Sequence, residues 1–475
     1  MLRGDILNKV NVCTHGNLFC DHYQVKGKNR CAHTPWGKRA EETVGSYISY
    51  KFFWFKIRKT NSCILYLHRF AGNIINEWAM CKGKPEVLLV CSDGGYYNLL
   101  RIPCILSKAG CNVSLLTTEN NILIGSRFVN CLLPQTPDIP SLILLLKAHL
   151  DENQNHYAWI IVGDDGVLFE LIKYRGEEWV EGWFPVDMKS DAVDIISTKE
   201  GFVRACSVNN IPFPASYICD SIHSAHAIAE KAGYPVMLKT MRGSSGSGVR
   251  CAQNAHELIN AYNSIKSPPK FILQKFINGL VGVTEILMEH GTPVAWISSY
   301  VYQTIDGRFG PSCARQFMEH VSIEKIILQL GKMLKFHGLC GFDWIHNQQD
   351  DSITVLEFHA RPPPGFHLGV ACNVNFSDGI RDMLLGIRTV RKPIVSSTTG
   401  KPKRVYMFPQ HVSRCIKERD FKDLIHWIPG IKSNWYYDIF LNDPILLKRI
   451  IFHSFFGKIK NLYQKRVTFF RIFAQ

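Results

Sequence analysis

The sequence predicts an α/β unit followed by an α+β unit. Residues 85–116 follow the order strand, glycine turn, helix and strand, which is the signature of a βαβ unit on a parallel sheet. Residues 196–390 alternate short helices with strands of the hairpin type, which is typical of an α+β fold. Of the 475 residues, 46% are hydrophobic and 20% are charged, an ordinary globular composition that excludes wholesale disorder.

The first unit contains the step from strand to loop twice. An apolar run at 86–91 leads into Asp93-Gly94-Gly95, an amphipathic stretch follows to Gly110, and a second apolar run covers 111–116. Residues 158–162 lead in the same way into the loop 163–166, Gly-Asp-Asp-Gly. Because Asp93-Gly94-Gly95 lacks the full glycine fingerprint of dinucleotide-binding proteins, we interpret it as a tight turn.

The second unit is expected to run through six elements. The pattern predicts helices over 197–209, 221–233 and 251–265, and strands over 234–239 and 271–274, with an extended segment starting at 211–214.

The net charge of +15 is concentrated at the two ends of the chain. Residues 1–80 carry 12 basic and 5 acidic residues, and residues 401–475 carry 15 and 5, which leaves 28 basic and 30 acidic residues between them. Basic flanks of this kind are attracted to nucleic acid, anionic membranes or acidic ligands. Since no nucleic-acid-binding motif accompanies the charge, no nucleic-acid partner is expected.

The sequence favours a cytoplasmic location. It contains no uninterrupted apolar run of about 18 residues, and its first residues lack the apolar core of a signal peptide. The 16 cysteines are spread thinly, as expected for reduced cytosolic thiols.

Two segments carry groups that suit phosphate and metal chemistry. Lys239 precedes a glycine- and serine-rich stretch over 243–249, whose backbone amides can turn onto phosphate oxygens, although a flexible connection is an equal alternative. Further on, Asp343 is followed by a strand on which Glu357, His359 and Arg361 share one face. Carboxylates suit Mg²⁺ and an arginine suits an anion, while the alternative is an exposed edge strand with a local salt bridge.

Together these segments resemble the ATP-grasp superfamily, in the group of carbamoyl phosphate synthase, biotin carboxylase and D-alanine–D-alanine ligase. The resemblance covers residues 196–390 and preserves the family's order of motifs. The family's lysine that opens a helix resembles Lys199, and its Pro-x-x-x-Lys strand before a Gly/Ser hairpin resembles Pro235 and Lys239 before 243–249. The family's hinge strand resembles 273–279. Its metal carboxylates, followed by an arginine, resemble Asp343, Glu357 and Arg361.

The resemblance implies a Rossmann-like pre-ATP-grasp domain followed by a two-lobed ATP-grasp fold. The corresponding divisions are a basic N-terminal extension (1–84), a pre-ATP-grasp βαβ domain (85–195), an ATP-grasp domain (196–390) and a basic C-terminal region (391–475).

The resemblance also implies an ATP-dependent carboxylate–amine ligase, with ATP and Mg²⁺ or Mn²⁺ as cofactors. Its implied partners are small-molecule carboxylate and amine substrates, and a homo-oligomer is compatible with the resemblance. The implied ATP-binding residues are Lys199, Lys239, Gly243, Ser244, Ser245, Gly246, Ser247, Gly248, Gln274, Lys275, Phe276 and Ile277. The implied metal ligands are Asp343, Glu357 and His359, and the implied catalytic residues are Arg361 and Arg315, although a surface position is the commoner one for an arginine such as Arg315.

Two departures from the family pattern keep a second function open. Val281 occupies the position of a ribose-binding glutamate, and His359 occupies that of a metal-binding asparagine. Because imidazole suits Mn²⁺ or Zn²⁺ better than Mg²⁺, the alternative is an ATP-binding protein with weakened catalysis that acts as an interaction or regulatory module.

The basic flanks each allow two interpretations. Residues 1–84 hold three Cys-x-His pairs that could bind zinc, but a loosely structured extension fits better. Near the C-terminus, Leu447, Ile450, Ile451 and Phe455 fall at helical spacing beside Lys448, which favours packing on the enzyme body, with peripheral membrane contact as the alternative.

Overall fold

A computed structural model describes residues 83–92, 97–153, 155–241, 248–265, 268–305, 310–393, 403–425, 435–437 and 441–456. The chain divides into two units, Met1–Cys81 and Lys82–Gln475, and all described residues belong to the second. Residues 1–82 of the N-terminal extension, which include the Cys-x-His pairs, and the Asp93-Gly94-Gly95 turn therefore lie outside the described residues.

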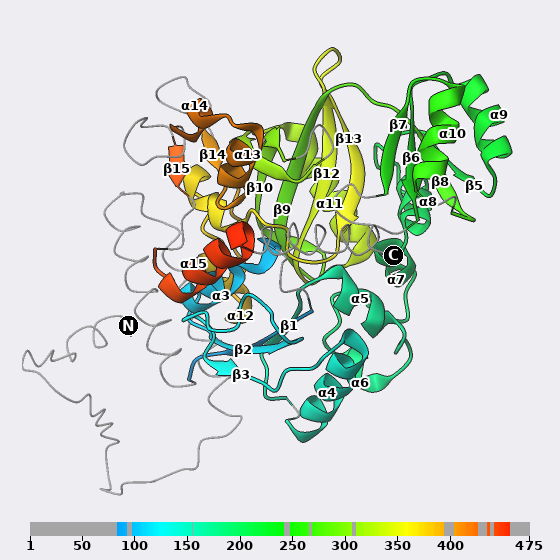
Figure 1. Ribbon diagram of the computed structural model, residues 1–475. Coiled ribbons are helices and arrows are strands. Elements are labelled where there is room, and N and C mark those ends of the chain that lie inside the picture. The colour runs from blue at the N-terminus through cyan, green and yellow to red at the C-terminus, as the bar shows by residue number, and fades with distance from the viewer. Residues whose placement is uncertain are drawn as a thin grey trace, which may run out of the picture. The chain divides into compact units, whose positions relative to one another are not determined.

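The predicted parallel sheet is confirmed (Figure 1). Its strands are β1 (Glu86–Cys91), β2 (Asn112–Thr117), β3 (Cys131–Leu132) and β4 (Trp159–Val162), arranged in the order β3-β2-β1-β4 with every neighbouring pair parallel. β1, β2 and β4 are almost fully buried, because α3 (Ile102–Lys108), α4 (Ile139–Glu152) and α5 (Asp165–Ile172) contribute to the two apolar cores beside them, whereas the short edge strand β3 is exposed.

A small antiparallel sheet follows, with the order β5-β8-β6-β7. Its strands are β5 (Ser216–Cys219), β6 (Val236–Thr240), β7 (Val249–Ala252) and β8 (Phe271–Lys275). The helices α9 (Ile222–Ala232) and α10 (Ala255–Ser264) share a separate apolar core with it and lie on its outer side in Figure 1. The expected helix over 251–265 is shorter than predicted, because 251–252 complete β7 and the side chain of Asn254 caps the helix by accepting a hydrogen bond from the Glu257 amide.

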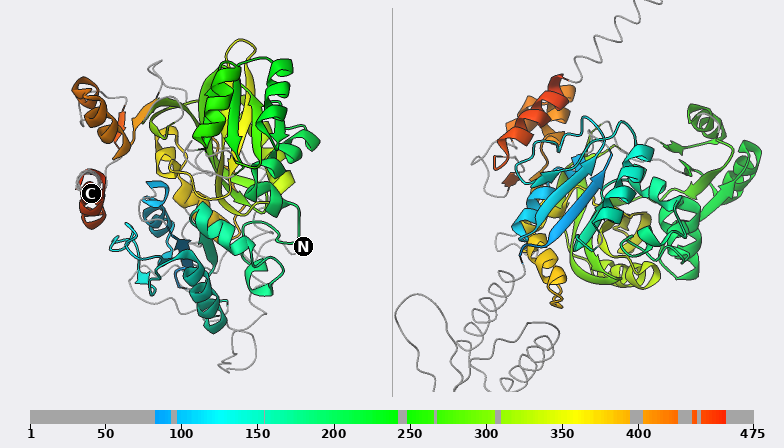
Figure 2. Two further views of the ribbon diagram at one scale, coloured as in Figure 1. Left: turned by 45° about the vertical axis from the view of Figure 1, so that its right-hand side comes forward. Right: turned by 90° about the horizontal axis from the view of Figure 1, so that it is seen from below.

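The largest sheet has seven strands in the order β13-β12-β9-β10-β11-β14-β15. The long strands are β9 (Leu280–Glu289), β10 (Thr292–Thr304), β11 (Ser312–Phe317), β12 (Gly338–Asn347) and β13 (Ser352–His359), all antiparallel to their neighbours. The helices α11 (Val321–Leu334) and α12 (Phe376–Leu384) pack against β10. Figure 2 shows the small sheet with α9 and α10 to one side of this large sheet.

The C-terminal region extends the same large sheet. β14 (Arg404–Tyr406) pairs with β11, and β15 (Trp435–Tyr437) pairs in parallel with β14, while α13 (Gln410–Glu418) and α14 (Phe421–Leu424) lie between them in the chain. These pairings place residues beyond 400 on the sheet that also carries the predicted metal ligands.

The last described helix, α15 (Pro444–Ile451), packs against the parallel-sheet region, as the sequence favoured. The hydroxyl of Ser126 donates a hydrogen bond of 2.5 Å to Asp443, and Arg449 donates one of 3.1 Å to the carbonyl of Asn121. The apolar face is rotated from the predicted one, because Leu446 and Ile450 are buried whereas Ile451 is exposed. No helix among the described residues is long and apolar enough to cross a membrane.

Candidate functional site

One pocket of about 810 Å³ collects the predicted site residues that the structure describes. Its lining comes from the small sheet, the large sheet and the loops at the end of the parallel sheet. The pocket size is in the range of small-molecule sites. The predicted residues that line it are Lys199, Lys239, Gly248, Gln274, Lys275, Phe276, Ile277, Arg315, Asp343, Glu357, His359 and Arg361. Gly243, Ser244, Ser245, Gly246 and Ser247 lie outside the described residues.

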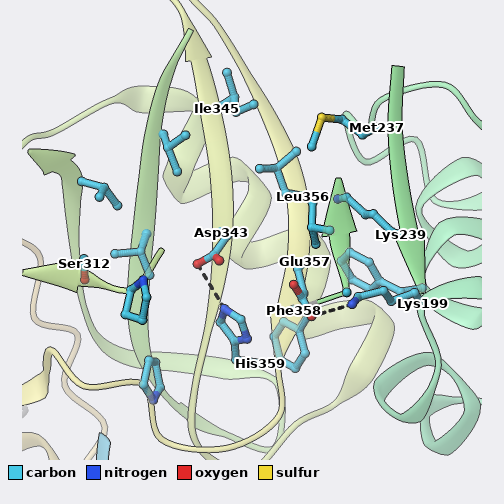
Figure 3. A pocket seen from close by; sticks show the side chains of 18 of the residues that line it. Lys199, Met237, Lys239, Ser312, Asp343, Ile345, Leu356, Glu357, Phe358 and His359 are labelled. Atoms are coloured by element: carbon cyan, nitrogen blue, oxygen red, sulfur yellow. Dashed lines mark ion pairs between the residues drawn. The ribbon is translucent and has the colours of Figure 1, made fainter. Parts of the chain in front are cut away.

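Lys239 is a buried lysine on the pocket side of the small sheet. Side chains alternate along β6, so Leu238 enters the core with α9 and α10 while Met237 and Lys239 face the pocket (Figure 3). The pKa of Lys239 falls from 10.5 to about 8, mainly because of burial and also because of the nearby charge of Lys199, against the opposing effect of Glu357 and Asp343. An ammonium held in such surroundings gains most when an anion enters the pocket.

Lys199 reaches the same pocket from the first turn of α8 (Lys199–Val208). Thr198 caps this helix by accepting a hydrogen bond from the Gly201 amide, which fixes where the helix begins. The Lys199 Nζ atom lies 3.8 Å from Oε1 of Glu357, so the pair joins α8 to β13 across the pocket (Figure 3).

Gly248 closes the hairpin between β6 and β7. A Cβ atom at this position would lie 2.0 Å from the hydroxyl oxygen of Thr240, a distance that no side chain tolerates. The glycine therefore allows the two strands to approach next to the Lys239–Val249 pair, at the end of the Gly/Ser-rich stretch.

The predicted hinge follows the end of β8. Gln274 is buried and donates a hydrogen bond of 2.9 Å from its amide to the hydroxyl of Ser216, whereas Lys275 is exposed. Phe276 and Ile277 line the pocket immediately afterwards, and Val281 lines it from the beginning of β9. Phe276, Ile277 and Val281 therefore add an apolar part to the pocket wall.

The two predicted metal carboxylates lie directly opposite each other on adjacent strands. Asp343 of β12 pairs in register with Glu357 of β13, beside a bulge that follows Asp343. His359, two residues beyond Glu357, places its Nε2 atom 3.1 Å from Oδ1 of Asp343 (Figure 3). Two carboxylates and an imidazole are donor groups that fit a divalent cation.

Asp343 and His359 shift one another's pKa values. Burial alone would raise the pKa of Asp343, but the charges of His359, Arg315 and Arg361 outweigh it and hold the pKa below 3.8. For His359, burial lowers the pKa, and the stronger effect of Asp343 raises it above 6.5. Each group therefore stabilises the charged form of the other.

Arg361 and Arg315 both line the pocket and are both buried, so Arg315 is not a surface residue. Nε of Arg361 lies 3.2 Å from Oδ1 of Asp165, and Arg315 forms an ion pair with Glu285 that is almost fully removed from solvent. The carboxylate partners restrain both guanidinium groups at the pocket wall.

Sequence reasoning missed Asp165 and Glu285 as members of this site. Asp165 is the first residue of α5, where the side chain of Asp164 caps the helix and also accepts hydrogen bonds from the backbone and hydroxyl of Ser92. Asp164 thus ties together the loops after β1 and β4, at the carboxyl ends of two parallel strands. Glu285 lies within the apolar strand β9, where an isolated carboxylate is itself a signal of a buried partner.

The chain is similar in sequence to one family model and to several known proteins. Residues 198–283 match the family model described as "Carbamoyl-phosphate synthase L chain, ATP binding domain". N-acetylaspartylglutamate synthase A of Mus musculus is 28% identical over 167 residues, which are 34% of this chain and 42% of the relative. Beta-citrylglutamate synthase B of Danio rerio is 26% identical over 209 residues, 40% of this chain and 50% of the relative. The chain thus spans half or less of these relatives.

Solved structures share the fold at low identity. N5-carboxyaminoimidazole synthetase from Staphylococcus aureus complexed with ADP matches with a TM-score of 0.55 at 14% identity, over 73% of this chain and 88% of that chain. Biotin carboxylase from Campylobacter jejuni, in complex with β,γ-ATP as its description states, matches with a TM-score of 0.50 at 14% identity, over 63% and 71%.

The likeness to these structures concerns the fold, and the match to the family model falls on the segment that carries Lys199, Lys239 and the hinge. The resemblance to the ATP-grasp superfamily, in its carboxylate–amine ligase-like group, is thus confirmed for residues 198–283 by the family model, and the solved structures share the fold.

Proposed function

We propose that this chain is an ATP-dependent ligase that activates a carboxylate as an acylphosphate for attack by an amine. The observation that carries the proposal is the single pocket in which two lysines, two strand-borne carboxylates and two buried arginines meet. This combination supplies cations for phosphate, donors for a divalent metal, and further cations for an anionic reacting centre.

We assign the nucleotide to the part of the pocket that is lined by β6 of the small sheet and by the hinge after β8. Lys239 and Lys199 would bind its phosphate oxygens, and the apolar hinge wall with Phe276 and Ile277 would take the adenine. Asp343, Glu357 and His359 would hold a divalent cation, which supplies neutralisation of phosphate charge when it is bound.

The reaction that this arrangement favours has two displacements. An oxygen of the substrate carboxylate attacks the γ-phosphorus, the bond from that phosphorus to the β,γ-bridging oxygen breaks, and ADP leaves. The amine then attacks the acyl carbon, and inorganic phosphate leaves with the electrons of the broken C–O bond as the amine loses a proton. Arg361, restrained by Asp165, would stabilise the tetrahedral oxyanion that exists after the amine has attacked the acyl carbon and before phosphate leaves.

The substrates are proposed to be a small polycarboxylate and an amino acid. The names of two relatives describe conjugates of glutamate, with an N-acetylaspartyl group in one and a citryl group in the other. The buried cations at the wall of this pocket are compatible with acidic substrates of that class.

The test is a substrate-pool screen for ADP release by the full chain, with mass spectrometry of any new product. Pools should pair carboxylates such as N-acetylaspartate and citrate with glutamate and other amino acids, in Mg²⁺ and separately in Mn²⁺. A product whose formation matches ADP release supports the ligase. If no pool yields ADP while ATP still protects the protein against unfolding, the alternative of a nucleotide-binding module with weakened catalysis is favoured instead.

The exposed side of α15 supports a second, separate proposal of peripheral contact with anionic lipid. Leu441, Ile445 and Phe452 are exposed, and the exposed Lys448 lies among them in the chain. An apolar surface with an adjacent cation, in a segment of net charge +10, matches an anionic membrane interface.

A further inference from the structure

Gln410 brings an unpaired polar side chain to the pocket from the C-terminal region. The pairing of β14 with β11 places α13 at this wall, and the Met407 amide donates a hydrogen bond of 2.8 Å to the carbonyl of Cys313. Gln410 is the first residue of α13, lines the pocket and is 7% exposed. Its side-chain carbonyl oxygen is buried and has no hydrogen-bond donor among the described residues.

Gln303 lines the same pocket from an irregular part of β10. The register between β10 and β11 shifts on both sides of Gln303, and residues 301–304 all line the pocket, although successive side chains of a regular strand face opposite sides. The side-chain NH₂ group of Gln303 donates a hydrogen bond of 2.8 Å to the carboxylate of Asp423. Because this carboxylate can only accept, the bond fixes the orientation of the amide, and the carbonyl oxygen is left buried without a donor in the part of the chain that the structure describes.

Asp423 of α14 connects the two glutamines. Its carboxylate holds Gln303, and its main-chain carbonyl oxygen lies 3.3 Å from Nε2 of His411, the residue after Gln410. A buried acceptor without a donor is unfavourable in the free protein. Both carbonyl oxygens are therefore suited to N–H groups of a ligand that enters the pocket.

The charges around this end of the pocket favour an uncharged N–H group over a cation. Arg315 lines the same pocket, and the N-terminal end of α13, which carries a partial positive charge, has no side-chain cap. The carboxylates of Glu285 and Asp423 are already paired, with Arg315 and Arg414 respectively. Amide carbonyl oxygens add no negative charge, so an amine gains hydrogen bonds here while its ammonium form gains no counter-charge.

We propose that Gln303 and Gln410 form the subsite of the amine substrate and bind this amine as its neutral free base. Only the free base has the lone pair that attacks the acyl carbon, and the proton of the ammonium form passes to the solvent before binding. This inference rests on the proposed ligase function and assigns its second substrate to the end of the pocket at α13. It also gives the C-terminal region a part in substrate binding.

The experiment is a calorimetric titration of the full chain, saturated with AMP-PNP and Mg²⁺, with L-glutamate or with glutarate. Glutarate has the same two carboxylates and lacks the amine, so the difference between the two ligands reports the contacts of the amine. Since an α-amino group is mostly protonated at pH 7, binding of the free base should release about one proton. This release is measured as a difference in observed enthalpy between buffers of different ionisation enthalpy.

Three substitutions extend the titration. Gln303→Met and Gln410→Met should each weaken the binding of L-glutamate about tenfold and leave the binding of glutarate unchanged, which also shows that the variants are folded. Gln349→Met makes the same chemical change at an exposed position outside the pocket and should alter neither affinity.

Gln410→Glu distinguishes a neutral subsite from a charged one. It keeps an acceptor and adds a negative charge, so L-glutamate should then bind as the ammonium form, without proton release. If the wild type binds L-glutamate no more tightly than glutarate, ordered water satisfies the two carbonyl oxygens and the inference is overturned. Binding of L-glutamate without proton release, or equally to both methionine variants, would overturn it as well, and so would binding of AMP-PNP without any binding of L-glutamate. Absence of AMP-PNP binding would instead refute the proposed function, and the inference with it.

Discussion

Replacement of Lys239 by methionine should have opposite effects on stability and on nucleotide binding. The side chain is 9% exposed, and its pKa falls from 10.5 to about 8 mainly because burial disfavours the ammonium form. That difference corresponds to a native-state cost of about 3 kcal/mol at pH 7, where the lysine is charged in both the folded and the unfolded chain. Lys239→Met should therefore raise the free energy of unfolding of the nucleotide-free protein by up to about 3 kcal/mol.

The same substitution should weaken ATP binding. A charge-assisted hydrogen bond to phosphate contributes about 1.5–3 kcal/mol, so the Kd for ATP should rise about 10- to 100-fold. In the wild type the affinity should also fall as the pH rises above about 8, because a neutral Lys239 must first take up a proton to bind phosphate. Lys239→Met should lack that loss of affinity.

The pH dependence of stability has the opposite sign. A folded pKa below the unfolded value means that between about pH 8 and pH 10.5 the unfolded chain binds more protons at this site than the folded one. The free energy of unfolding of the wild type should therefore rise relative to that of Lys239→Met across this interval. The stability advantage that Lys239→Met has at pH 7 should accordingly become smaller as the pH rises to about 10.5.

Urea unfolding followed by tryptophan fluorescence, with and without ATP and a divalent cation, measures both effects. Lys231→Met makes the same chemical change at an exposed position on α9 and should alter neither quantity. The reasoning is refuted if Lys239→Met is less stable than the wild type without nucleotide and is still stabilised by ATP to the same extent.

Further substitutions test three other parts of the structure. Glu357→Gln should lower ADP release about 100-fold or more in the screen above and change the urea midpoint little, because the side chain is 36% exposed; full activity would contradict its metal role. Glu285→Gln should cost about 3–5 kcal/mol in urea unfolding by leaving Arg315 unpaired in the wall, and Glu285→Gln combined with Arg315→Met should recover part of that loss; equal losses would contradict the pairing. Ile445→Glu and Phe452→Glu should each reduce cosedimentation with phosphatidylserine vesicles at low salt, and unchanged binding would remove α15 from any membrane contact.

Local patterns pointed to part of the pocket, and the family resemblance added the rest, including Lys199, the hinge and Arg315. Lys239 ends a strand before glycines, and Glu357 and His359 repeat with the period of a strand, so each position follows from its immediate neighbours. The parallel order of β1, β2 and β4 likewise follows from the loops between them.

The features that sequence reasoning missed depend on distant pairings. Glu285 meets Arg315 from 30 positions away, and Asp165 meets Arg361 from 196 positions away. Neither spacing leaves a periodic signal. The addition of β14 and β15 to the large sheet has the same character, since both are three-residue strands.

The face of α15 shows a different difficulty. Apolar residues occupy 445–447 and 450–451, a wide sector of the helix interrupted by Lys448 and Arg449, so the pattern does not say which of them enters the core. Packing against the parallel-sheet region selects Leu446 and Ile450, four residues apart, and leaves Ile451 outside. A rotation of about one residue separates the prediction from the structure.

The pairing of the pocket cations indicates which of them are available to an incoming anion. Arg315 and Glu285 are 4% and 0% exposed, and a phosphate that displaced this carboxylate would leave a buried negative charge behind. Lys199 and Glu357 are 3.8 Å apart and partly exposed, so their separation costs little. Among the described residues, no carboxylate lies within ion-pair distance of Lys239. Phosphate oxygens should accordingly bind Lys239 and Lys199, whereas Glu285 stays paired with Arg315 and fixes the position from which this arginine faces an anionic substrate at the pocket wall.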